Sequence, residues 1–180
     1  MKYCALKYRL EKGKIIYPNG DIYEGEILFG MKHGFGKLIE IIGLNYIGNF
    51  MFDQKEGEGQ IENPNCKCQF FGKFENDKKI GFGRRVSCRG EVVDGKYEND
   101  ELNFGTIYYS NGDKYCGEIY GLRPHGKGEL FLRGKNVFQQ GTWIYGEKEL
   151  NSKFTKSNLY DPEDDVMNSF RNGNSDAFGY

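Results

Sequence analysis

The chain has 180 residues, of which 38% are hydrophobic and 16% aromatic, and its formal net charge is −1. Balanced charge gives no reason to expect a nucleic-acid partner, and no apolar run reaches the roughly 18 residues that a membrane-spanning helix needs. The start, MKYCALKYRLEKGK, lacks an apolar signal core, and the sequence holds no N-x-S/T acceptor, so we expect a cytoplasmic protein that is not secreted.

Glycine and cysteine usage narrow the class of protein further. The 26 glycines are about double the usual share of roughly 7%, and the aromatic residues are nearly all Tyr and Phe, which suits a thin structure with rings stacked along one face. The cysteines are Cys4, Cys66, Cys68, Cys88 and Cys116, with no C-x-x-C pair. We therefore expect reduced thiols, no metal site and no cofactor.

The first predicted unit of structure is a short repeat at the start of the chain. Starting at Tyr23, YEGEILFGMKHGFG sets a frame: an aromatic residue at 0, Gly at +2, an apolar residue at +4, a turn residue at +7, and Gly at +11 and +13. Upstream, Gly13 occupies the place of a closing +13 glycine. Residues 1–13 are therefore interpreted as a degenerate first copy of the repeat.

Further copies follow along the chain, with starts at 23, 46, 70, 93, 115 and 139 that are 22 to 24 residues apart. The last copy, like the first, is incomplete. The repeat-defining positions are Tyr23, Gly25, Gly34, Gly36, Tyr46, Gly48, Phe50, Gly57, Gly59, Phe70, Gly72, Phe74, Gly81, Gly83, Gly95, Tyr97, Tyr115, Gly117, Gly126, Gly128, Gly141 and Trp143.

Each copy reads as two strands. Side chains alternate between faces of a strand, so Tyr46, Gly48 and Phe50 share one face. The glycine leaves room between two bulky residues for a ring from a neighbouring strand. The +11 and +13 glycines are expected to do the same on the returning strand, where Gly34 and Gly36 would share a face.

Turn signals separate the predicted strands. Phe52-Asp53 and Asn76-Asp77 lie inside copies, and Asn19-Gly20 and Asn111-Gly112 between copies predict type I′ hairpins. Each copy is then one β-hairpin, and the chain forms about thirteen strands. The expected fold is all-β: an elongated, curved, single antiparallel sheet with one aromatic face.

These residues resemble the MORN repeat, whose frame is Y-x-G-x-(aromatic)-x-x-G-x-x-x-G-x-G. The resemblance covers roughly residues 1–148 as about six repeats. Departures are Val93 and Gln139 at the aromatic start, Phe104 at a +11 glycine, and Gly121 one place early.

The histidines and the basic residues near the turns are candidate functional groups. His33 and His125 both stand at +10 of the repeat. A general base needs a unique arrangement of catalytic groups, so a recurring position indicates turn capping rather than catalysis. The basic residues near the turns, which are Lys32, Lys55, Lys78, Lys79 and Arg123, either are solvated or contact anionic lipid. Acidic residues in the same turns, Asp53, Asp77 and Asp100, offset them.

Residues 149–180 form a tail without the repeat frame. Asp161 and Pro162 begin a predicted short helix over 162–171. Val166, Met167 and Phe170 form its apolar stripe, which either caps an open strand edge or docks onto a partner.

The resemblance implies a non-enzymatic scaffold that binds other proteins of a multi-subunit complex. Its aromatic face either packs on itself or forms a groove for a partner segment, and we expect both together. The closest kind of match is the radial-spoke head proteins of motile cilia, so a ciliary axoneme or cytoskeletal location is expected. The alternatives are a phospholipid-binding membrane-contact module, an accessory subunit of another large complex such as a mitochondrial one, and the regulatory arm of an enzyme.

Overall fold

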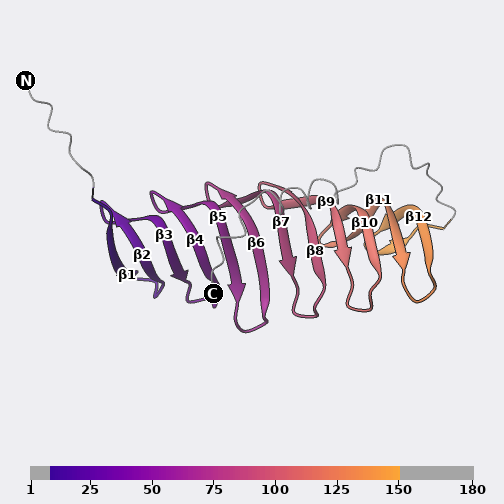
Figure 1. Cartoon of the computed structure of the whole chain (residues 1–180), viewed down its shortest axis with the longest axis horizontal. Helices are drawn as coiled ribbons and strands as arrows, with labels where there is room; N and C mark the ends of the chain where they lie inside the picture. Colours follow the sequence, from indigo (N-terminus) through magenta and orange to yellow (C-terminus); the bar gives the residue numbers. More distant parts are fainter. Residues whose placement is uncertain (1–8, 151–180) are drawn as a thin grey trace, which may run out of the picture. The chain divides into compact units, whose positions relative to one another are not determined.

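The computed structural model describes residues 9–150 and places thirteen β-strands among them (Figure 1). The strands form one open antiparallel sheet whose spatial order follows the chain order, which confirms the predicted all-β fold. Over the described range, no helix is long and apolar enough to cross a membrane. The expected helix at 162–171, with Val166, Met167 and Phe170, lies outside the described residues. The division into 1–148 and 149–180 stays a prediction.

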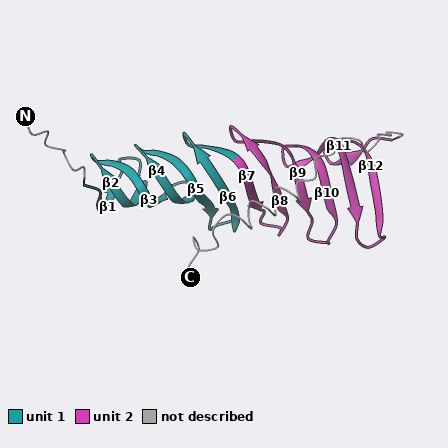
Figure 2. Cartoon of the chain, turned by 45° about the horizontal axis from the view of Figure 1, so that its top comes forward, with its two compact units in different colours: residues 1–80 teal, residues 81–180 magenta. Residues whose placement is uncertain are grey.

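The chain divides into two compact units, Met1–Ile80 and Gly81–Tyr180 (Figure 2). The first unit holds β1 (Glu11–Ile16), β2 (Ile22–Leu28), β3 (Met31–Ile39), β4 (Asn45–Met51), β5 (Gln54–Asn63) and β6 (Cys68–Glu75). Strand β7 (Lys78–Val86) begins at the end of this unit. The second unit continues with β8 (Val92–Glu98), β9 (Glu101–Tyr108), β10 (Lys114–Tyr120), β11 (Arg123–Leu132), β12 (Val137–Ile144) and β13 (Glu147–Lys148).

Glycine lies opposite glycine at the centre of neighbouring strands in each unit. In the first unit this row consists of Gly13, Gly25, Gly36, Gly48, Gly59 and Gly72. In the second unit it consists of Gly83, Gly95, Gly105, Gly117, Gly128 and Gly141. The sequence frame therefore sets the strand register, because the +2 glycine of one strand meets the +13 glycine of the next.

The turns between copies differ from the prediction. The Gly20 N–H donates to the Tyr17 carbonyl at 2.9 Å, and Gly20 has a φ of 93°. Asn19 has no positive φ, because its side-chain oxygen accepts a bond from the Asp21 N–H at 3.1 Å. Type I′ needs positive φ at both central residues, so that prediction is wrong here and at Asn111-Gly112. The turn is a three-residue loop that ends in a left-handed glycine.

Type I′ geometry occurs instead at the turns inside the copies. Two consecutive residues of positive φ are found at Phe29-Gly30, Phe52-Asp53, Asn76-Asp77, Asn99-Asp100, Gly121-Leu122 and Tyr145-Gly146. Glycine, asparagine and aspartate adopt this conformation readily, whereas a larger side chain costs roughly 1–2 kcal/mol. The two-residue loops match the right-handed twist of the strands that they join.

The +11 glycines lie in β-bulges. Gly25 pairs with Gly36 and Ile27 pairs with Lys32, so β3 has two more residues than β2 over this stretch. Gly34 lies in the bulge with a φ of 61°, and a Cβ there would meet the Glu26 carboxylate rather than a ring. The expectation that Gly34 shares the ring face is therefore wrong. Positive φ recurs at the equivalent Gly57, Gly81 and Gly126.

Candidate functional site

The tyrosine that opens a copy lies over the glycine row. Tyr46 is 1% exposed, and its hydroxyl donates to the Asn49 carbonyl at 3.0 Å. A Cβ added at Gly48 or at Gly59 would lie 2.5 Å from the Tyr46 hydroxyl oxygen. The gap left by the glycines is thus filled by the ring of the same copy. The sequence predicted a ring from a neighbouring strand instead, and that prediction is wrong. Alternation shows which face of a strand a side chain occupies but not the direction in which it leans along the strand.

The same arrangement recurs in other copies. The Tyr23 hydroxyl donates to the Glu26 carbonyl at 2.7 Å, and the Tyr115 hydroxyl donates to the Glu118 carbonyl at 2.8 Å. Where the copy opens with Val93, a Cβ on Gly95 would lie 2.5 Å from Leu102, so an aliphatic side chain takes the place of the ring.

The rings of the first unit form one continuous edge-to-face series. Tyr23, Phe50, Tyr46, Phe74 and Phe70 follow in this order, with centroid distances of 5.2, 5.0, 5.1 and 5.6 Å. All five are at most 5% exposed. These rings form the core of the unit, so the predicted self-packing is present and an open aromatic groove along them is not.

An edge-to-face ring contact also occurs in the second unit. Tyr115 and Trp143 meet edge to face at 5.5 Å, and the Trp143 indole N–H donates to the Gly128 carbonyl at 3.3 Å. Trp143 stands at +4 of the last copy, where it packs against the Tyr115 ring. Tyr97 is also buried here, with 5% of its surface exposed.

Burial raises the pKa of the tyrosines in both units. Desolvation raises the pKa of Tyr23 to about 12, and it does the same for Tyr97 and Tyr109. It also raises the pKa of Tyr46 and Tyr115 well above the ordinary value. The hydroxyls of Tyr23, Tyr46 and Tyr115 donate to backbone carbonyls, and the raised pKa keeps these donors protonated to a higher pH than in the unfolded chain.

Lysine side chains cover the rings. The Lys55 ammonium lies 5.3 Å from the Tyr46 ring centroid, and Lys79 lies 5.4 Å from that of Phe70. Lys32 lies 4.9 Å from the Tyr17 ring and bonds the Tyr17 hydroxyl at 3.2 Å. Lys32 and Lys55 are neither solvated nor free to contact lipid as the sequence predicted, since their side chains are only 12% and 18% exposed.

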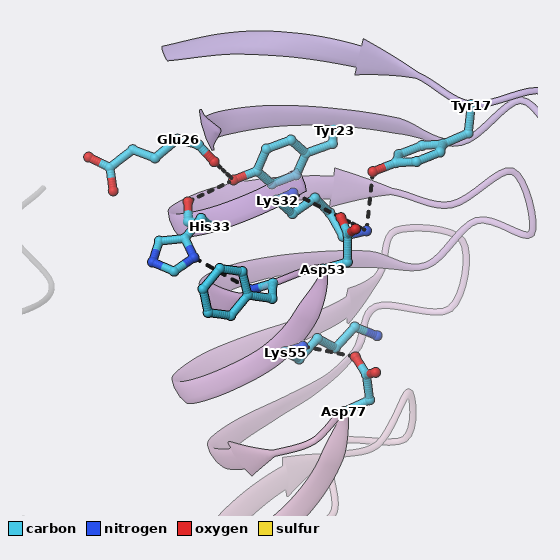
Figure 3. A network of polar contacts seen from close by, with 9 residues as sticks. Tyr17, Tyr23, Glu26, Lys32, His33, Asp53, Lys55 and Asp77 are labelled. Atoms are coloured by element: carbon cyan, nitrogen blue, oxygen red, sulfur yellow. Dashed lines mark hydrogen bonds and ion pairs between the residues drawn. The ribbon is translucent and has the colours of Figure 1, made fainter. Parts of the chain in front are cut away.

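Asp53 and Asp77, each in the turn of a hairpin, link that hairpin to the one before it (Figure 3). The Lys32 N–H donates to Asp53 Oδ1 at 2.8 Å, and the Asp53 N–H donates back to the Lys32 carbonyl at 2.9 Å. Asp77 and Lys55 repeat both bonds at 2.8 and 3.1 Å. We call this two-bond contact the turn latch. Sequence reasoning treated these aspartates as turn residues and as charges that offset lysines, and it missed the bonds that they make to the preceding hairpin.

The two histidines lie at the turns but differ in their bonds. His33 Nδ1 accepts from the Phe52 N–H at 3.4 Å, and the two rings meet at 4.9 Å, so this residue caps a turn (Figure 3). His125 lies against the rings of Tyr120 and Tyr145, at 5.6 and 5.1 Å. Its Nδ1 is buried without a hydrogen-bond partner, so the predicted capping bond is absent there.

Metal-ligand chemistry has little support in residues 9–150. No group of three or more His, Cys, Asp or Glu residues in this range is arranged to hold a metal ion. Cys66, Cys68, Cys88 and Cys116 form no disulfide in this range, and Cys4 lies outside the described residues.

Comparison with known families identifies the frame. The MORN repeat family matches residues 23–39 and 46–65. These two segments are MORN repeats. They cover β2 to β5, where the tyrosine, glycine pair and bulge are most regular.

Sequence similarity to individual proteins extends over most of this chain's length. The chain is 25% identical over 176 residues to alsin from Rattus norvegicus and from Mus musculus, and 25% identical over 170 residues to alsin from Homo sapiens. Each alignment covers 89% of this chain but 10% of the relative. This chain therefore spans about a tenth of the length of the relatives that it matches.

Proposed function

We propose that this chain is a non-enzymatic scaffold subunit whose MORN repeats bind other proteins in a large assembly. One observation carries the proposal: the groups best suited to chemistry in the matched copies are bonded to the repeat itself. The hydroxyls of Tyr23 and Tyr46 donate to backbone carbonyls, and His33 accepts from a backbone N–H. A general acid or base must instead reach a substrate atom.

The partial similarity to alsin supports a modular role. The aligned region makes up 10% of those proteins, so this kind of segment occurs together with other parts of a longer chain. In such a longer protein, the repeat segment would supply a surface for binding, and the other parts of that protein would supply other activities. A ciliary or cytoskeletal location of the radial-spoke kind, or a place in a mitochondrial complex, stays a prediction from the resemblance.

The membrane-contact alternative has less support. It relied on a row of basic turn residues that would meet anionic headgroups. Lys32 and Lys55 lie over aromatic rings and beside Asp53 and Glu40, at 3.2 and 3.5 Å. The charge available to a lipid surface is therefore lower than the sequence indicates.

Purification of the tagged chain from its native cells, under mild conditions with chemical crosslinking, tests the proposal. The proposal predicts partner proteins retained at constant stoichiometry through two separation steps, and no flotation of the purified chain with vesicles of phosphatidylcholine and phosphatidylserine. Recovery of the chain alone, with flotation, would contradict it.

A further inference from the structure

Two of the cysteines share one turn of the first unit. Cys66 and Cys68 are separated by Lys67 at the end of the loop that joins β5 to β6. Both cysteines are half-buried, whereas Lys67 between them is exposed. Cys88 and Cys116 lie in the second unit, and neither has another cysteine within two residues. Within residues 9–150, a close pair of thiols in the sequence therefore occurs at this turn alone.

This turn differs from the two earlier turns between copies. Each of those ends a three-residue loop with a glycine at positive φ, Gly20 at 93° and Gly43 at 87°. The β5–β6 loop has four residues, and Lys67 at its end takes the positive φ, at 57°. In the second unit a loop of the same length ends with Asn136, at 51°. Asparagine adopts this conformation more readily than lysine does, so the backbone between the two cysteines is strained, as is typical of positions with a role beyond folding.

The strained backbone brings the two cysteines within reach of a disulfide. Around a helical residue of either hand, the Cα atoms of the two neighbours lie roughly 5.4 Å apart, whereas an extended residue would separate them by roughly 6.7 Å. Disulfides span about 4.4–6.8 Å between Cα atoms, most often about 5.5–6 Å. The left-handed φ of Lys67 therefore favours the shorter separation.

The Cys68 side chain points back along the turn. Its thiol donates to the Cys66 carbonyl at 3.7 Å, so the sulfur of one cysteine lies beside the backbone of the other. Cys68 is also the first residue of β6 and pairs with Asn63 on β5. A bond between the two cysteines would lie within the loop and at its junction with β6, and the strand register beyond this point would be kept.

We propose that Cys66 and Cys68 form a reversible disulfide by exchange with a small-molecule disulfide such as oxidised glutathione. The thiolate of one cysteine attacks the small disulfide, whose S–S bond breaks as a mixed disulfide forms and one small thiol leaves. The thiolate of the second cysteine attacks the protein sulfur of that mixed disulfide, which forms the Cys66–Cys68 bond and releases the second small thiol. The two cysteines lose two electrons and two protons, and the small disulfide gains them.

The position of the pair makes this bond a reversible modification rather than a structural crosslink. The bond closes a loop of three residues, so it removes little freedom from the unfolded chain. Both cysteines are half-buried at the surface of a turn, where a thiol can attack the bond again. The state of the turn would then follow the balance of thiols and disulfides around the protein. This modification is independent of the proposed scaffold function.

The test uses the purified full chain, reduced and then equilibrated in glutathione buffers of graded composition. Remaining thiols are blocked by alkylation, and the chain is digested with trypsin and measured by mass spectrometry. Trypsin cleaves after Lys67, so the bond holds residues 56–67 and 68–73 in one species until it is reduced. We expect this linked species in the folded chain at a glutathione ratio at least about tenfold more reducing than in the chain unfolded in urea, because the fold holds the two cysteines close together.

The matched control is Cys88→Ser/Cys116→Ser, which removes the thiols of the second unit and leaves the turn intact. This variant should form the linked species at the same glutathione ratio as the wild-type chain. The variant Cys66→Ser should give a glutathione adduct at Cys68 and no linked species. Mixed disulfides that persist in the wild-type chain, disulfides between chains in place of the linked species, or equal closure in the folded and unfolded chain would each overturn the proposal.

Discussion

Replacement of Gly48 by alanine tests the packing of a ring on a glycine pair. A Cβ at Gly48 would lie 2.5 Å from the Tyr46 hydroxyl oxygen and 2.7 Å from the Gly59 Cα, so the ring must move. It would lose its bond to the Asn49 carbonyl, worth about 1 kcal/mol. It would also weaken its contacts with Phe50 and Phe74, worth about 0.5–1.5 kcal/mol each. We expect Gly48→Ala to lower the free energy of unfolding by about 2–4 kcal/mol.

Thermal melting and hydrogen exchange measure this loss. For a unit of this size the melting temperature should fall by roughly 10 °C or more, and exchange should rise first in β4 and β5. The control is Gly134→Ala, since Gly134 has no positive φ and no atom within 4 Å of an added Cβ. That variant should melt within a few degrees of wild type. Equal melting of the two variants would refute the role assigned to the glycine row.

Three further predictions concern the polar groups of the repeat. Tyr46→Phe keeps the ring but removes the hydroxyl bond, so it should cost about 1 kcal/mol in a chemical denaturation curve; no loss would show that the bond is unimportant. Asp77→Ala removes the acceptor of the turn latch and places alanine at a φ of 68°, so it should cost about 1–3 kcal/mol, whereas Asp77→Asn should stay within about 0.5 kcal/mol. Burial raises the pKa of Tyr23 to about 12, so unfolded chains lose this proton first as pH rises through about 10. Stability should then be full below pH 10 and fall between pH 10 and 12, less steeply in Tyr23→Phe; identical alkaline curves would contradict this assignment.

The period of the sequence predicted the architecture, because each copy carries its own strand and turn signals. Glycines at fixed offsets imply a fixed register, and the observed pairing of Gly48 with Gly59 follows from the frame. The antiparallel order follows in turn from short connections. Regular alternation was enough to place Tyr46 and Phe50 in the core.

Turn chemistry and long side chains were harder to predict. Asn19 can adopt left-handed φ, but here its side chain bonds the Asp21 N–H and keeps it out of that region. The bulge at Gly34 breaks alternation without any change in the glycine spacing. Lysines near turns were read as solvated or lipid-facing, yet Lys55 reaches back over Tyr46, because its stem can cover a ring while its charge keeps polar partners.

The native mass of the tagged chain in cell extract tests the scaffold proposal most directly. The scaffold proposal predicts a particle several times heavier than the 20.7 kDa of the chain alone. Mild detergent should leave its mass unchanged, and protein denaturant should reduce it. A species that migrates at the mass of a single tagged chain, or one that loses its extra mass in detergent, would contradict the proposal.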